Sequence, residues 1–190
     1  MNPLRGIGLK VLSVCVFVAM AVCIKAAAPH VPPGQAVFFR SFFALPVIIT
    51  WMAWQRDLRR GLRTSYPLGH LWRGLVGTSA MGLGFTALGL LPLPEATALG
   101  YAAPLLTVIF AAMFLGEQVR AFRLTAVLFG LVGVVIVLLP NLSVGLDDAS
   151  AAQAVGAMAA LLGAVCAALA QVFVRKLIHT EKTTAIVFYF

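Results

Sequence analysis

The chain has 190 residues, of which 62% are hydrophobic and only 11% are charged. A soluble domain carries about 25% charged residues and exposes roughly half of its residues to water. The composition therefore excludes a soluble enzyme, a nucleic-acid-binding domain and a disordered chain. The net charge of +8 fits this conclusion, because the basic residues form short clusters between apolar runs, the pattern that sets the topology of membrane proteins.

Six apolar runs are long enough to cross a bilayer, which takes about 20 residues in a helix. Turn signals separate them, and the first run is rather long for a signal peptide and is followed by five others. A seventh run begins near Thr183 and is cut off at Phe190. The chain is thus predicted to be an all-α integral membrane protein, with spans at 6–28, 34–54, 71–91, 95–116, 122–139 and 153–174.

The basic residues predict how these spans are oriented. If the N-terminus is cytoplasmic, every Lys and Arg except Lys25 and Arg40 lies on the cytoplasmic side, as the positive-inside rule requires. Lys25 then lies at the outer end of the first span. The cytoplasmic set is Arg5, Lys10, Arg56, Arg59, Arg60, Arg63, Arg73, Arg120, Arg123, Arg175, Lys176 and Lys182.

A weak internal match relates the sixth span to the first. Gly6 aligns with Gly156, and Lys25, at the end of the first span, aligns with Arg175 at the end of the sixth. Two unrelated apolar helices can also produce such a match. If it is a repeat, the unit has five helices, and an odd number inverts the second unit in the membrane, as in many secondary transporters.

Charged residues at the spans are the first candidates for a site. Arg40 lies well inside the second span, where a charge faces a cavity or a partner, unless its side chain reaches the outer interface. Lys25 and Glu95 are predicted to shape the electrostatics of an outer mouth, although Glu95 can also be a stabilising acid at a helix N-terminus. The sequence shows no metal-ligand spacing, and neither a metal nor a cofactor is predicted.

Proline and aromatic residues are the second set of candidates. Pro46 and Pro104 lie inside the second and fourth spans, and each is predicted to kink its helix because proline has no N–H to donate. Such breaks are tolerated where the freed backbone lines a cavity, so Arg40 near one kink and Tyr101 near the other predict a central pocket. The aromatic residues that stack on a planar cargo, or else serve only in packing, are Tyr101, Phe38, Phe39 and Phe85.

Several motifs resemble those of EamA-type transporters of the drug/metabolite transporter superfamily. They are residues 87–99, which contain Leu91-Pro92-Leu93-Pro94-Glu95, then Pro104–Thr107, Phe114–Glu117, the Phe39-Arg40 pair and Lys25. The resemblance implies two inverted five-helix repeats, a central cavity, and alternating access for small metabolites or vitamins. Residues 32–40 and 68–74 are most similar to riboflavin importers, and less closely to S-adenosylmethionine carriers.

These expectations combine into one prediction. Residues 6–139 form the first repeat, 140–152 an outer loop, and 153–190 the truncated start of the second repeat. The protein is expected to be a secondary transporter, not an enzyme, in a bacterial inner membrane, and it carries a vitamin- or nucleoside-like metabolite, with riboflavin the first candidate. The alternative is a truncated, non-transporting membrane fragment or an assembly partner. Pairing of one repeat with a second copy, as a homodimer, is a further possibility that the sixth span argues against.

Overall fold

The computed structural model describes residues 3–54, 64, 66–142, 148–178, 180–181 and 183–189. These residues are almost entirely helical, and the described ranges contain no strand. This confirms the predicted all-α class. The helices are α1 (Pro3–Ala27), α2 (Pro33–Trp54), α4 (Pro67–Leu90), α5 (Leu93–Gly100), α6 (Ala102–Leu115), α7 (Ala121–Leu142), α8 (Asp148–Leu177) and α9 (Thr183–Phe188).

Five helical segments of the described chain have the length and apolar composition of membrane spans. They are Leu4–Ala27, Pro33–Trp54, Leu93–Leu115, Ala121–Pro140 and Ser150–Leu177. The third predicted span, 71–91, is the helix α4, which is long enough but less apolar than the other five. The difference lies in its composition, since α4 contains His70, Arg73 and a series of glycines.

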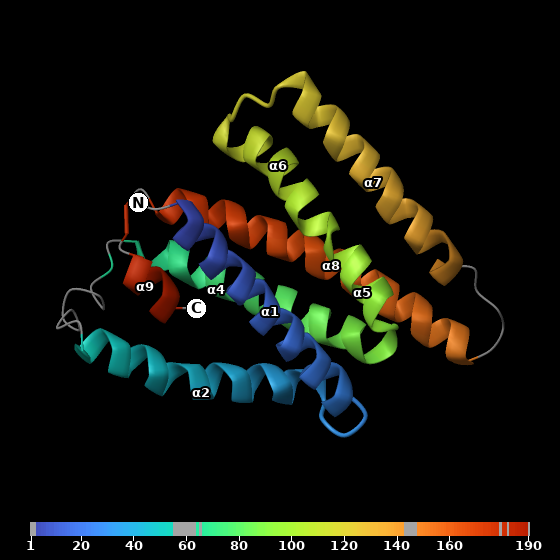
Figure 1. Cartoon of the computed structure of the whole chain (residues 1–190), viewed down its shortest axis with the longest axis horizontal. Coiled ribbons are helices and arrows are strands. Elements are labelled where there is room, and N and C mark those ends of the chain that lie inside the picture. The colour runs from blue at the N-terminus through green and yellow to red at the C-terminus, as the bar shows by residue number, and fades with distance from the viewer. Residues whose placement is uncertain are drawn as a thin grey trace.

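Successive spans alternate in direction (Figure 1). The start of α1, the α6–α7 connection and the end of α8 lie at one end of the bundle, and the α1–α2 and α4–α5 connections lie at the other. α1 and α8, the helices matched by the sequence repeat, run in opposite directions, as an inverted repeat requires. The four basic residues in the α2–α4 connection fall outside the described residues, as does Lys182; they are Arg56, Arg59, Arg60 and Arg63.

The core lies where α4 and α8 run side by side, with α5 and α6 packed against them. Small residues bring the backbones together: an added Cβ on Gly163 would lie 3.2 Å from Leu83 Cβ, and one on Gly156 would lie 2.9 Å from Leu90 Cβ. Leu91 and Leu99 are completely buried at this junction. Close approach at small residues is the usual basis of helix association in lipid. α1, in contrast, leaves its apolar side chains exposed, as a lipid-facing helix does.

Both ends of the predicted outer loop 140–152 are helical. α7 continues through Pro140 to Leu142, and α8 begins at Asp148. Residues 143–147 of the predicted loop lie outside the described residues. The sequence predicted that the span ends at residue 139, before Pro140, but proline in a last turn removes one hydrogen bond without forcing the helix to stop there. α8 starts early because its first turns are rich in alanine, the strongest helix former.

Candidate functional site

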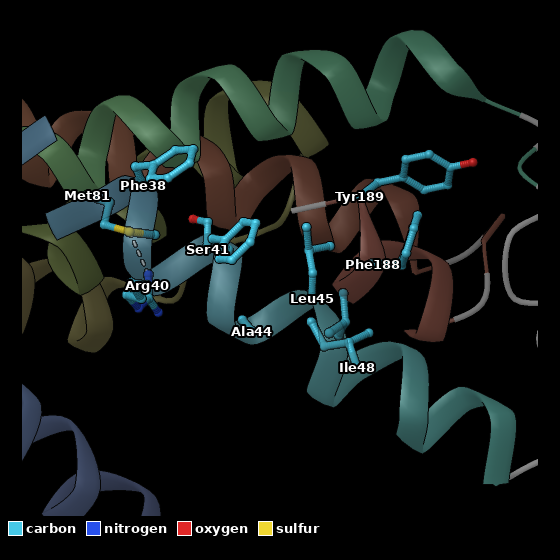
Figure 2. Close-up of a pocket in the computed structure, with 11 residues that line it drawn as sticks. Phe38, Arg40, Ser41, Ala44, Leu45, Ile48, Met81, Phe188 and Tyr189 are labelled. Carbon is cyan, nitrogen blue, oxygen red and sulfur yellow. Dashed lines mark hydrogen bonds between the residues drawn. The ribbon is translucent and has the colours of Figure 1, made fainter. Parts of the chain in front are cut away.

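A pocket of about 580 Å³ lies between α2, α4 and the end of α9. Figure 2 shows Arg40 beside Met81 in one part of this pocket, and Phe188 and Tyr189 in another. α2 supplies most of the wall, because residues three and four apart fall on one face of a helix. The residues that line it are Phe38, Arg40, Ser41, Phe42, Ala44, Leu45, Ile48, Met81, Val187, Phe188 and Tyr189.

Arg40 is the charged residue among those that line this pocket. Its side chain crosses from α2 to α4, where Nη1 donates to Met81 Sδ at 2.6 Å (Figure 2). A thioether sulfur is a weak acceptor, and a guanidinium has five N–H donors. Within the described ranges Arg40 forms no ion pair, so none of the carboxylates whose side chains the structure describes neutralises its positive charge.

Four phenylalanines form two rows on α2 next to Arg40. Phe38 stacks on Phe42 with ring centroids 5.8 Å apart, and Phe39 stacks on Phe43 at 6.1 Å. The rows touch edge to face, since the Phe38 and Phe39 centroids are 5.5 Å apart. Phe38 and Phe42 line the pocket. Phe39, predicted as a cavity residue, lies in the neighbouring row, contacts Phe38 edge to face and is not among the residues that line the pocket.

The fourth predicted span is broken at Tyr101. α5 ends at Gly100, whose carbonyl Pro104 cannot bond, and α6 begins at Ala102. The break predicted from Pro104 is therefore confirmed. Tyr101 is 69% exposed, and with Pro104 it lines a separate groove between α5, α6 and α7, opposite Gly130 and Gly133.

Other cavity candidates are dispersed. Phe85 is buried in α4 and lines neither the pocket at Arg40 nor the groove at Tyr101. Pro46 lies inside α2, which continues through it as one helix, and borders a shallow groove with Trp51 and Trp54. The structure thus brings Arg40 together with Phe38 but places Tyr101, Pro104, Phe85 and Pro46 elsewhere. Their contact with cargo stays a prediction.

Lys25 holds the C-terminal end of α4. Its Nζ donates to the Leu91 carbonyl at 2.6 Å and to the Gly89 carbonyl at 3.3 Å. These are carbonyls that the end of a helix leaves unpaired, and a cation there also complements the helix dipole. Glu95 lies half-buried in the first turn of α5 and pairs with neither Lys25 nor Arg40 in the described part of the chain. This position matches the alternative explanation of Glu95, an acid at a helix N-terminus.

Glu181 holds the N-terminal end of α4, as Lys25 holds its C-terminal end. The sequence did not predict this contact. Its Oε1 accepts from the Tyr66 backbone N–H at 2.9 Å and from the Thr64 hydroxyl at 3.0 Å. Its Oε2 lies 3.9 Å from His70 Nε2, and both side chains are only 3% exposed. The sequence shows Glu181 as an acid next to Lys182 in a short connection between two helices. It does not indicate that this carboxylate lies beside Thr64, Tyr66 and His70, more than a hundred positions earlier.

A second interaction that the sequence did not predict joins the fourth and sixth spans. Arg175 Nη1 donates to both carboxylate oxygens of Glu117, at 3.0 Å each. Glu117 lies close to Arg120 in the sequence, but its partner comes from the last turn of α8. Both side chains are about two-fifths exposed, so the pair is interfacial and contributes little to stability.

Comparison with known proteins decides the family. The model of the EamA-like transporter family matches residues 4–139. The chain belongs to the EamA-like transporter family. A second family model, solute carrier family 35, matches residues 96–189. Both describe transporters and not enzymes, and no solved structure matches the chain.

Curated relatives in this family have different cargoes in their names. The chain is 30% identical over 185 residues to the pseudopaline exporter CntI of Pseudomonas aeruginosa, covering 97% of this chain and 62% of the exporter. It is 32% identical over 136 residues to an S-adenosylmethionine uptake transporter of Rickettsia bellii, covering 72% of this chain and 46% of that protein. A riboflavin transporter of Rhizobium johnstonii is 29% identical over 109 residues, covering 57% of this chain and 35% of its own. The chain thus spans less than two thirds of the length of these relatives.

Proposed function

We propose that the full-length protein is a secondary transporter that carries a small organic metabolite across the membrane by alternating access. The observation that carries this proposal is the pocket between α2, α4 and α9, which is mostly apolar and contains the single charge of Arg40. A few placed polar groups in an apolar pocket are the usual composition of a small-molecule site. Membership of the EamA-like family supports the same function.

The membrane is proposed to be a bacterial inner membrane, with the N-terminus in the cytoplasm. Bacterial relatives support the compartment. Arg5 is near the start of α1, Arg123 near the start of α7, and Arg175 in the last turn of α8. These three helix ends lie at the same end of the bundle (Figure 1). The opposite end carries Lys25. That asymmetry supports the orientation through the positive-inside rule.

Alternating access requires that the two ends of the pathway do not open together. Two separate sets of hydrogen bonds are available for this, because Lys25 binds the C-terminal end of α4 and Glu181 binds its N-terminal end. We propose that each is released in turn while the other persists. When each contact can be either formed or broken, a small shift at one end of α4 can change the conformation of the whole bundle.

Transport in proteoliposomes tests the proposal. The cargoes to use are riboflavin, S-adenosylmethionine and pseudopaline, which the names of the relatives supply, with each compound measured in both directions. We expect saturable movement of at least one compound, strongly reduced by Arg40→Ala and unchanged by Arg123→Ala, which removes an exposed arginine of α7. Movement unaffected by Arg40→Ala would remove the role of this pocket, and movement of none of the three would count against these cargoes.

A further inference from the structure

The unmatched charge of Arg40 narrows the chemistry of the cargo. A half-buried cation among Phe38, Phe42 and Leu45 has lost part of its hydration and needs a negative partner in return. Met81 Sδ does not supply one, because a thioether is uncharged and a weak acceptor. The other polar side-chain groups on the wall are the hydroxyls of Ser41 and Tyr189, which are uncharged, and the rest of the wall is aromatic or aliphatic.

The acids of the chain whose side chains the structure describes are engaged or located elsewhere. Glu117 is paired with Arg175, and Glu181 holds the start of α4. Glu95 lies in the first turn of α5, a helix that does not contribute to the pocket. None of these three lines the pocket, and the partner of Arg40 is therefore sought in the cargo.

We infer that the cargo is an aromatic or otherwise planar apolar molecule with a carboxylate, and that this carboxylate pairs with Arg40. A guanidinium presents a flat fork of N–H donors that fits the two oxygens of a carboxylate, and such charge-assisted pairs are about twice as strong as neutral hydrogen bonds. Phe38, Phe42 and Tyr189 provide ring surfaces for the apolar part. Riboflavin is uncharged at neutral pH and would leave Arg40 unmatched. This inference rests on the proposed function, and it specifies the substrate class of the same site.

A matched pair of probes tests it on the purified full-length protein in detergent. Indole-3-acetate and indole-3-acetamide have nearly the same shape and ring, and only the first is an anion. We expect indole-3-acetate to raise the midpoint of thermal unfolding by a few degrees at concentrations well above its Kd, and indole-3-acetamide to raise it less. From the strength of hydrogen bonds to charged groups, loss of the Arg40 contact should weaken binding of the acetate by about ten- to a hundred-fold.

Three variants and one lipid define the outcomes. Arg40→Gln should remove the preference for the acetate, Arg40→Lys should retain part of it because the charge stays and the fork is lost, and Arg123→Gln should retain all of it. Equal effects of the two probes on the wild type, including no effect of either, would overturn the inference. So would a preference that survives Arg40→Gln. The lipid probe is phosphatidylglycerol. If it shifts the unfolding midpoint in an Arg40-dependent way and indole-3-acetate does not, Arg40 binds a lipid headgroup and the inference is overturned as well.

The two proposals can fail separately. If an uncharged compound is transported at the same rate by wild type and Arg40→Gln, the protein is a transporter and the carboxylate inference is wrong. The opposite result is that indole-3-acetate binds in an Arg40-dependent way, but neither indole-3-acetate nor riboflavin, S-adenosylmethionine or pseudopaline crosses the membrane. In that case the binding site is real and the proposed transport function is wrong.

Discussion

At the scale of single residues, the charges that matter most are those that act on a helix from outside it. Lys25 and Glu181 come from α1 and from the α8–α9 connection, and they satisfy opposite ends of α4 with opposite signs of charge. Each sign complements the helix dipole at its end. The sequence located Lys25 and Arg40 as unusual cations, but it could not name Leu91 or Met81 as their partners, because these contacts join residues distant along the chain.

Replacing Lys25 by methionine should destabilise the protein. The carbonyls of Gly89 and Leu91 lose a charged donor, and we expect a loss of about 1–2 kcal/mol in the free energy of unfolding. Thermal unfolding in detergent measures it. Lys10→Met is the matched control, because Lys10 is exposed in α1, and an equal loss in both variants would contradict the capping role of Lys25.

Two substitutions of Glu181 separate its hydrogen bonds from its charge. Glu181→Ala removes the carboxylate acceptor of the Thr64 hydroxyl and leaves the Tyr66 N–H with only Thr64 Oγ1, 3.1 Å away, and we expect it to cost about 1–3 kcal/mol. Glu181→Gln retains an oxygen acceptor at the same reach and should cost clearly less. Chemical unfolding curves compare the two, and a larger loss in Glu181→Gln than in Glu181→Ala would show that these hydrogen bonds do not hold the end of α4.

At the scale of the elements, sequence periodicity predicted helices well and interhelical contacts poorly. The break at Tyr101 followed from Pro104, since the missing N–H is a local property. The position of Tyr101 in a groove facing α7, away from Arg40, depends on how whole helices pack. Apolar length alone likewise predicted α4 as a span like the others, whereas its glycines and its extensive contact with α8 place one face of it in the core of the bundle.

The α4–α8 contact gives a prediction about glycine. Gly156→Ala would place a Cβ 2.9 Å from both Leu90 Cβ and Leu91 Cγ, too close for either helix to keep its position, and we expect a lower unfolding midpoint. Gly133→Ala meets nothing within 4 Å and should be neutral or slightly stabilising, because alanine is favoured over glycine in a helix by about 1 kcal/mol. Unfolding midpoints measured side by side test this, and equal losses would mean that α8 does not approach α4 as described.

At the scale of the whole molecule, the alternation of spans assigns each connection to one end of the bundle (Figure 1). The proposed orientation can be measured with single cysteines in a cysteine-free background. His30→Cys, exposed in the α1–α2 connection, should react with a membrane-impermeant maleimide in intact cells, whereas Gln118→Cys, exposed between α6 and α7, should react only after the membrane is opened. The reverse pattern would invert the topology.

The modest hydropathy of α4 has a consequence for how the protein is made. A helix with His70, Arg73 and several glycines gains less from entering lipid than its neighbours do. Its principal partner, α8, leaves the ribosome much later. We therefore expect α4 to stay beside α1 and α2 during synthesis and to settle in the bilayer only when α8 arrives. The insertion of this protein into the membrane, like its folded core, then depends on α8.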